Sequence, residues 1–251
     1  MGVDLSTVKV LVVDDQLLVR TLISQVLRNF GVKSEAVFQA TDGNNALHVL
    51  AARQVDIILC DMQMAPVNGM DLLKEIRCAR TPNPPNLPFV FLSGHPERNN
   101  ILLASKLHAD GFVIKPPKPN DIEKNLLTAL ERPRPAIDPF GYLAIATGSE
   151  YDTRNFELPL APKQSHDLDL LLDRFHVDKE IKAVVPGDIM SKDLLDQNGR
   201  VLLPRGVKIQ KVQLAILAKY QALYGVHTLA VAELPHDQMI MYQDYYGINP
   251  E

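Results

Sequence analysis

The strongest constraint on this 251-residue chain is an alternation, repeated five times between Lys9 and Glu131, of short apolar runs with longer segments of helical period. Such alternation is the sequence sign of β-α units that build a parallel sheet covered on both faces. The predicted strands are Val10–Val13, Ala36–Gln39, Ile57–Cys60, Phe89–Leu92 and Phe112–Ile114. The predicted helices are Gln16–Asn29, Gly43–Arg53, Met70–Arg80, Arg98–His108 and Asn120–Glu131. The first half is therefore predicted to be a doubly wound α/β domain with a five-stranded parallel sheet.

Charged and hydroxyl residues follow four of the predicted strands. Asp14 and Asp15 come after the first strand, Asp61 after the third, Ser93 after the fourth and Lys115 after the fifth. Ligands of open α/β sheets bind outside the carboxyl ends of the strands, so these side chains are expected to converge. Carboxylates packed closely repel one another unless a cation lies among them, and an oxygen-only set suits Mg²⁺. The sequence thus predicts a magnesium site with a lysine beside it.

This constellation predicts chemistry on phosphorus. A carboxylate such as Asp61 can attack phosphorus to give an acyl phosphate, while the metal and Lys115 balance charge on the phosphoryl oxygens and Ser93 donates a hydrogen bond. Each residue alone has a simpler interpretation. Asp14 and Asp15 could cap the following helix, and Lys115 could be a solvated lysine at a strand end. Only their expected convergence favours a functional site.

Four segments carry a resemblance to a known family. They are LVVDD at Leu11–Asp15, LCDMQM around Asp61, FLSG ending in Ser93-Gly94, and GFVIKPP around Lys115. Through them the chain from about residue 8 to residue 131 resembles the receiver domains of two-component response regulators. The resemblance implies a flavodoxin-like receiver fold, with Asp61 as the phosphoacceptor.

The same resemblance implies roles for further residues. It places Mg²⁺ on Asp15, Asp61 and the backbone carbonyl of Gln63, with Asp14 acting largely through water. It also makes Ser93 and Phe112 a switch pair, although Phe112 lacks the hydroxyl of the tyrosine often found at this position. Simple core packing of Phe112 is the alternative.

Proline content divides the chain after Glu131. The run RPRPAIDP cannot continue a helix and favours an extended spacer. The predicted organisation is a phosphoacceptor receiver domain over 1–131, a proline-containing polar linker over 132–166, and a smaller C-terminal α+β module over 167–251. Within that module, helices are predicted at 167–175 and 210–224, a hairpin turn at Asn198-Gly199, and a strand at 227–234.

The C-terminal module has a weaker resemblance of its own. Through VPGD at Val185–Asp188 and the segment Gly199–Gly206, it resembles a small α/β segment that accompanies HD-GYP-type regulators. The resemblance implies a link to cyclic-di-GMP signalling. No set of spaced histidines could supply the di-metal site of such an enzyme, so the module is expected to be non-catalytic.

Charge and cysteine content limit the function classes. Of the 26 basic and 30 acidic residues, 13 and 17 come after Leu130, and this acidic excess disfavours a DNA-binding output. The two cysteines, and the lack of any long apolar segment or signal-like N-terminus, favour a cytoplasmic protein with no membrane association.

The expected function is therefore that of a response regulator that is not an enzyme. A cognate histidine kinase or phosphotransfer protein would phosphorylate Asp61, and the output would be contact with an effector protein, possible homodimer formation included, with no nucleic acid. A degenerate or regulatory component of cyclic-di-GMP signalling is the alternative, and a transcriptional regulator is the third reading.

Overall fold

The computed structural model describes residues 3–94, 97–134, 136–156, 166–236, 238, 239 and 242. The chain divides into two compact units, Met1–Glu157 and Leu158–Glu251. None of the helices in these described ranges is both long and apolar enough to span a membrane.

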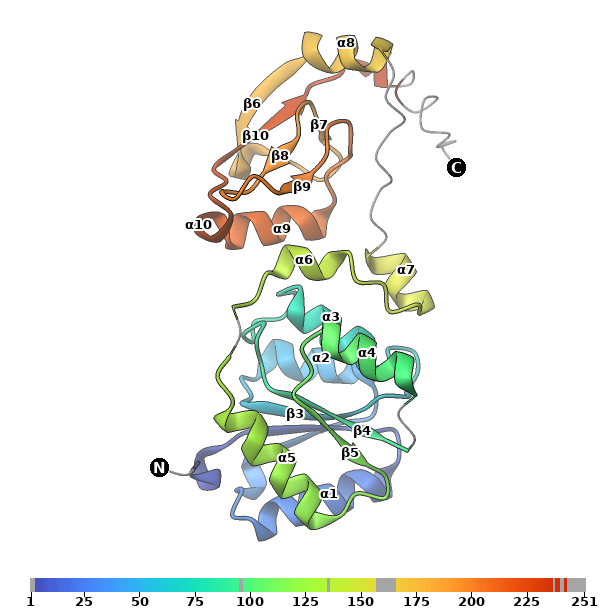
Figure 1. The fold of residues 1–251 in the computed structure, drawn as a ribbon, viewed down its shortest axis with the longest axis vertical. Helices are drawn as coiled ribbons and strands as arrows, with labels where there is room; N and C mark the ends of the chain where they lie inside the picture. Colours follow the sequence, from blue (N-terminus) through green and yellow to red (C-terminus); the bar gives the residue numbers. More distant parts are fainter. Residues whose placement is uncertain are drawn as a thin grey trace. The chain divides into compact units, whose positions relative to one another are not determined.

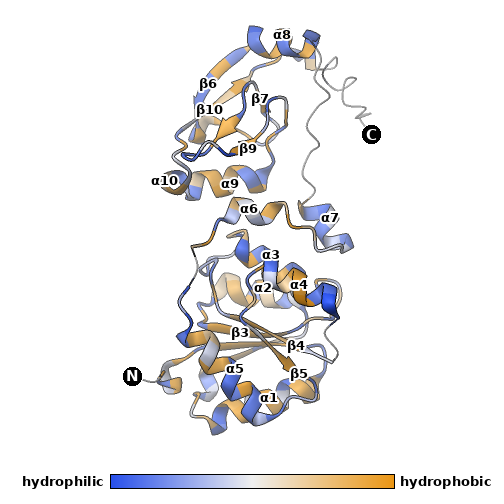
Figure 2. Cartoon of the chain, in the orientation of Figure 1, coloured by the Kyte–Doolittle hydropathy of each residue, from blue (hydrophilic) through white to orange (hydrophobic). Residues whose placement is uncertain are grey.

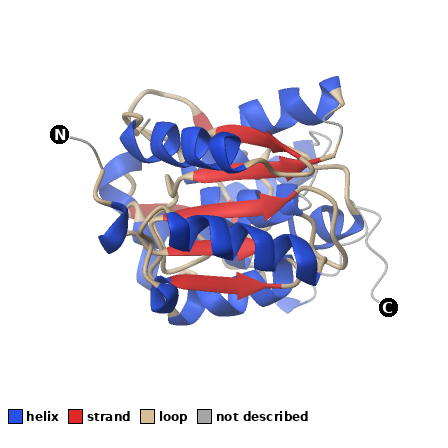
Figure 3. Ribbon diagram, turned by 90° about the horizontal axis from the view of Figure 1, so that it is seen from below, coloured by secondary structure: helices blue, strands red, loops and turns tan. Residues whose placement is uncertain are grey.

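The first unit is built on a five-stranded sheet. Its strands are β1 (Val10–Val13), β2 (Val37–Ala40), β3 (Ile57–Asp61), β4 (Phe89–Ser93) and β5 (Gly111–Ile114), in the spatial order β2-β1-β3-β4-β5. All four pairings are parallel, and Val13 of β1 lies opposite Ala40 of β2 and Cys60 of β3. Figure 3 shows the strands side by side between helices. The predicted fold class is confirmed, with strand bounds within a residue of those expected.

Helices cover both faces of this sheet (Figure 1). They are α1 (Leu17–Asn29), α2 (Gly43–Ala52), α3 (Gly69–Arg77), α4 (Arg98–Lys106) and α5 (Pro119–Glu131). Helices α1 and α5 lie on one face and contribute Ile23, Leu27, Ile122 and Leu126 to the core, while α2, α3 and α4 lie on the other. The central strands β1, β3 and β4 are buried at every position, which explains their continuous apolar sequence (Figure 2).

The segment after α5 differs from the predicted linker. Residues 139–143 form α6 (Pro139–Leu143) and residues 150–156 form α7 (Glu150–Phe156), and both belong to the first unit. Pro139 lies in the first turn of α6, where proline is tolerated, and the Asp138 side chain accepts a hydrogen bond from the Gly141 N–H at 3.2 Å. The proline therefore starts a helix instead of extending a spacer. The predicted linker end at 166 falls next to residues 157–165, which lie outside the described part.

The second unit is a small α+β fold. It contains α8 (His166–Arg174), β6 (His176–Glu180), β7 (Ile189–Met190), β8 (Leu194–Leu195), β9 (Val201–Leu203), α9 (Lys211–Lys219), α10 (Gln221–Tyr224) and β10 (Thr228–Ala232). Its sheets are antiparallel, in the orders β6-β10-β7 and β8-β9.

The helix predicted at 167–175, the hairpin turn and the strand predicted at 227–234 correspond to α8, the β8–β9 turn and β10, whereas two other features differ from the prediction. The turn between β8 and β9 passes through Gly199, whose φ of 80° is in the left-handed region that glycine adopts readily. The single helix predicted at 210–224 is interrupted at Tyr220, which separates α9 from α10. Strand β6 was not predicted because its sequence, HVDKE, is polar and has no buried position.

Candidate phosphoacceptor and metal site

The residues expected to form a site do lie at the carboxyl ends of the sheet strands. Asp14 follows β1 directly, Asp61 is the last residue of β3, Ser93 is the last of β4, and Lys115 follows β5. The backbone N–H of Lys115 donates to the Ser93 carbonyl at 2.8 Å and so continues the pairing of β5 with β4. Parallel pairing of β1, β3, β4 and β5 thus places all four residues at one edge.

Lys115 joins the two buried carboxylates. Its Nζ lies 2.6 Å from Asp61 Oδ2 and 2.7 Å from Asp14 Oδ2. The Asp14 side chain is fully buried and the Lys115 side chain is 16% exposed. Since both carboxylates contact one ammonium group, their mutual repulsion is offset without leaving the site open to bulk water.

The pKa shifts follow from these contacts. Burial raises the pKa of Asp14 above its usual value, and the Asp61 carboxylate adds to the rise while Lys115 opposes it. Burial alone would lower the pKa of Lys115, but hydrogen bonds to Asp14 and Asp61 outweigh it and leave the pKa raised. Lys115 is therefore held in its charged form.

Three carboxylates are close enough to share one cation. Oxygen atoms of Asp14, Asp15 and Asp61 all lie within 4.8 Å of one another. Asp15 is exposed, whereas Asp14 and Asp61 are buried. A set of carboxylate oxygens with one member open to solvent fits Mg²⁺, which takes few protein ligands and keeps several waters.

The backbone around Asp61 is tightly packed. The Gln63 N–H donates to Asp61 Oδ1 at 3.2 Å and orients the carboxylate. A side chain at Gly69 would place its Cβ 2.3 Å from the Asp61 carbonyl oxygen, so the start of α3 can approach β3 only because residue 69 is glycine. Burial raises the pKa of the neighbouring Cys60 thiol well above its usual value, as expected of a small buried apolar side chain.

Arg20 is a site residue that the sequence did not reveal. Its guanidinium, on α1, donates to the backbone carbonyl of Asp14 at 2.7 Å and is buried. An arginine one turn into an amphipathic helix looks like part of the solvated face, so no sequence signal marked it. Phe112, the proposed switch partner of Ser93, is half-buried and stacks on Phe91 with ring centroids 5.7 Å apart.

Comparison with known proteins agrees with this geometry. The family model "Response regulator receiver domain" matches residues 10–127. The chemotaxis protein CheY of Pseudomonas aeruginosa is 32% identical over 108 residues, which cover 84% of that protein and 43% of this chain. The chain belongs to the response-regulator receiver family.

Two further similarities cover the same receiver region. The autoinducer 1 sensor kinase/phosphatase LuxN of Vibrio campbellii is 38% identical over 107 residues, or 43% of this chain. The chain spans only 12% of the length of LuxN. The crystal structure of CheY4 of Vibrio cholerae is 27% identical, covers 47% of this chain and 95% of that one, and has a TM-score of 0.43. The receiver-family match ends at residue 127, before α6 begins.

Proposed function

We propose that this receiver takes a phosphoryl group on Asp61 from a cognate histidine kinase or phosphotransfer protein. One observation supports this most directly: the Asp61 carboxylate lies at the end of β3 with Lys115 Nζ 2.6 Å away and two further carboxylates beside it. In the transfer, an Asp61 oxygen forms a bond to phosphorus as the bond from phosphorus to the donor breaks. Lys115 then offsets negative charge on the phosphoryl oxygens.

We assign the metal to Mg²⁺. Asp14, Asp15, Asp61 and the backbone carbonyl of Gln63 would hold it, with Asp14 acting largely through water. When bound, the ion neutralises charge on the transferring phosphoryl group. Asp14 is suited to an indirect role because its Oδ1 already accepts a hydrogen bond from the Gln16 N–H at 2.9 Å.

Ser93 and Phe112 form the proposed switch. Phosphorylation adds negative charge and acceptor oxygens at Asp61, and Ser93 moves to donate a hydrogen bond to them. Phe112 is half-buried, so it can turn further inward and change the surface formed by α4, β5 and α5. Without a hydroxyl, Phe112 is drawn inward by apolar burial alone.

The output is proposed to be protein contact instead of catalysis or DNA binding. After Leu130, acidic residues outnumber basic ones by 17 to 13, and this balance favours a protein partner, such as an effector or a second copy of the chain, over nucleic acid. Both cysteines are buried and unpaired, which fits a cytoplasmic location.

Labelling by acetyl phosphate tests the phosphoacceptor. With Mg²⁺ present, intact-mass spectrometry is expected to show one added phosphoryl group on the wild-type protein and none on Asp61→Asn. Asp121→Asn, an exposed aspartate in the first turn of α5, is the matched control and should be labelled like the wild type. Labelling of Asp61→Asn at another residue would exclude Asp61 as the acceptor.

A further inference from the structure

The segment that follows the receiver folds back over helix α3. We call residues 138–156, which comprise α6, α7 and the connection between them, the strap. All nine residues of α3 are buried, although the helix contains Asp71, Lys74, Glu75 and Arg77. Four large side chains of the strap are buried as well: Phe140, Tyr142, Leu143 and Phe156. The strap is therefore an integral layer of the first unit.

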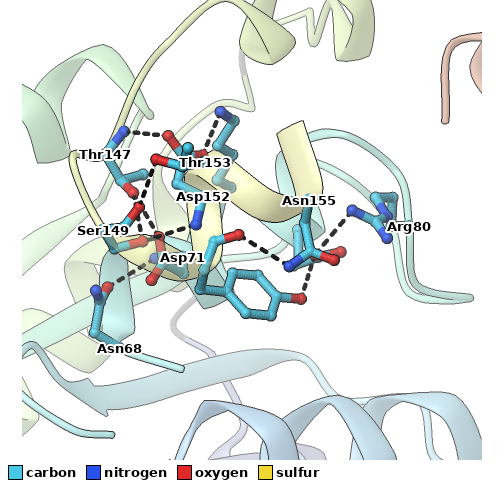
Figure 4. Close-up of polar contacts among 11 residues, drawn as sticks. Asn68, Asp71, Arg80, Thr147, Ser149, Asp152, Thr153 and Asn155 are labelled. Atoms are coloured by element: carbon cyan, nitrogen blue, oxygen red, sulfur yellow. Dashed lines mark hydrogen bonds and ion pairs between the residues drawn. The ribbon is translucent and has the colours of Figure 1, made fainter. Parts of the chain in front are cut away.

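Polar contacts attach the strap to α3 (Figure 4). The hydroxyls of Thr147 and Ser149 both donate to Asp71 Oδ1, at 2.5 and 2.8 Å. One turn further along α3, Lys74 Nζ lies 2.6 Å from Asp152 Oδ1, and this pair is almost fully buried. Groups on one face of α3 thus meet complementary groups on the strap.

A second row of contacts extends along the same helix. The Tyr151 hydroxyl donates to Glu75 Oε1 at 2.6 Å. The Phe156 ring lies under two cations, with its centroid 4.3 Å from Lys74 Nζ and 4.9 Å from the Arg80 guanidinium carbon. Such charged and aromatic pairs are strongest where water is excluded, as it is around the buried side chains of Lys74 and Phe156.

The start of α3, close to the residue that binds the strap hydroxyls, packs against the backbone of the phosphoacceptor. The Gly69 N–H donates to the Met62 carbonyl at 3.2 Å, and the backbone of Gly69 packs directly against that of Asp61. Asp71, which receives both strap hydroxyls, is only two residues after Gly69. A shift of the loop between β3 and α3 would therefore displace the start of α3, and with it the carboxylate that receives the strap hydroxyls.

The strap also borders a pocket shared with the acidic site. Thr147 lines a pocket of about 600 Å³ together with Asp15, Gln63 and Asn68. Asp15 and Gln63 belong to the proposed metal site, and the Asn68 side chain caps α3 by accepting from the Asp71 N–H at 2.9 Å. Thr147 thus contacts α3 through its hydroxyl and also lines this pocket.

We propose that the strap is an autoinhibitory lock: seated on α3, it stabilises the unphosphorylated arrangement of the pocket, and phosphorylation of Asp61 loosens it. This inference rests on the proposed function. Lys115 contacts both Asp14 and Asp61, so a phosphoryl group on Asp61 would draw the Lys115 ammonium group away from its present contacts. A phosphoryl group on Asp61 would add negative charge near the start of α3, where the carboxylate of Asp71 is already buried.

Coupling of this kind is reciprocal, so weakening the strap must favour the phosphorylated arrangement. The double variant Thr147→Val, Ser149→Ala removes both hydroxyls that reach Asp71. Beryllofluoride, a mimic of the phosphoryl group, is titrated with Mg²⁺ and followed by ¹⁹F NMR. The variant is expected to bind it at least about fivefold more tightly than the wild type does.

Arg154→Ala is the matched control. Arg154 pairs with Glu150 on the exposed side of α7, and both side chains are more than two-thirds solvent-accessible, at 73% and 78%. The affinity of the Arg154→Ala variant for beryllofluoride should equal that of the wild type. Circular dichroism of all variants establishes that they are folded. Equal affinities of the double variant and the wild type would overturn the lock, and weaker binding by the double variant would overturn its direction.

Hydrogen exchange of the wild type gives a second, independent reading. Amides of residues 138–156 are expected to exchange about fivefold faster with beryllofluoride than without it, and no change is expected in Asp61→Asn. Failure of the wild type to bind beryllofluoride would overturn the proposed function itself, and the lock with it. Binding without any change in strap exchange would overturn the lock alone.

Discussion

The buried carboxylates of this protein differ in the groups that compensate their negative charge. Asp14 and Asp61 share the ammonium group of Lys115, at 2.7 and 2.6 Å. Within the described residues no cation pairs with Asp71, and its Oδ1 accepts hydrogen bonds from the hydroxyls of Thr147 and Ser149. Hydroxyl donors compensate a buried negative charge less fully than an ion pair does.

The pKa of Asp71 carries a consequence for stability. Burial raises it above the usual 3.8, the Asp152 carboxylate adds to the rise, and the hydroxyls of Thr147 and Ser149 oppose it. The pKa of Asp71 is higher in the folded than in the unfolded chain. Its stabilising contribution is therefore fully present when the pH is below the pKa of the unfolded chain. It is lost as pH rises through the folded value.

Asp71→Asn should therefore be at least as stable as the wild type at pH 7, since asparagine keeps an oxygen for both hydroxyls without the buried charge. The advantage should shrink as the pH falls towards 3.8, the usual pKa of this carboxyl group. Urea unfolding of both proteins across this range measures the difference. A variant less stable than the wild type at pH 7 would mean that the Asp71 charge is favourable.

Among individual residues, the sequence predicted those whose positions follow from the topology of the sheet. Asp14, Asp61, Ser93 and Lys115 were expected to converge because each follows a strand of a parallel sheet, and the end of a strand is visible as a change from apolar to polar residues. Arg20 was not predicted. It acts through a backbone carbonyl, and such contacts depend on a three-dimensional path that residue spacing along a helix does not reveal.

The complete burial of helix α3 could not be predicted from the amphipathic pattern of its sequence. Its sequence, GMDLLKEIR, alternates apolar and charged residues as a half-exposed helix would, yet every position is buried. The charged face is covered by groups of opposite character from the strap, and Arg77 donates to the carbonyls of Pro85, Leu87, Leu107 and His108. Polarity along α3 therefore marks a polar interface and not a solvated surface.

Breaking the buried ion pair between α3 and α7 is expected to lower the stability of the protein substantially. Lys74→Met leaves Asp152 buried without its cation, which should cost about 3–5 kcal/mol of unfolding free energy. Chemical denaturation measures it, with Lys106→Met in the exposed last turn of α4 as the control. The double variant Lys74→Met, Asp152→Leu should recover most of the loss. A cost below about 1 kcal/mol for the single variant would show that the pair is dispensable.

The same interface explains the difference between the predicted linker and the observed strap. Residues after Gly148 are polar and weakly periodic, a pattern typical of loops. Here Ser149, Tyr151 and Asp152 are polar because their partners on α3 are polar. An interface between two polar surfaces gives no hydrophobic signal in either sequence, so only the packed structure reveals it.

On the scale of the whole molecule, the first unit extends to Glu157 and not to the predicted receiver end at residue 131. The added layer buries four large apolar side chains, Phe140, Tyr142, Leu143 and Phe156. A side chain of this size contributes about 1.5–3 kcal/mol when fully buried. The strap should therefore stabilise the receiver substantially.

Two fragments test this extension. Residues 1–157 should unfold cooperatively with a free energy close to that of the first unit in the full chain. Residues 1–131 should be less stable by about 3 kcal/mol or more, because α3 loses its cover. Urea titrations followed by circular dichroism compare them. Equal stability of the two fragments would show that the receiver ends at residue 131 after all.

The strap also determines the length of flexible chain that joins the two units. While the strap is attached to α3, its 19 residues belong to the folded first unit and do not lengthen the segment that follows. As a flexible chain they would span roughly 25 Å, and this length would be added to the tether between the units. Releasing the strap would therefore act as a change in tether length.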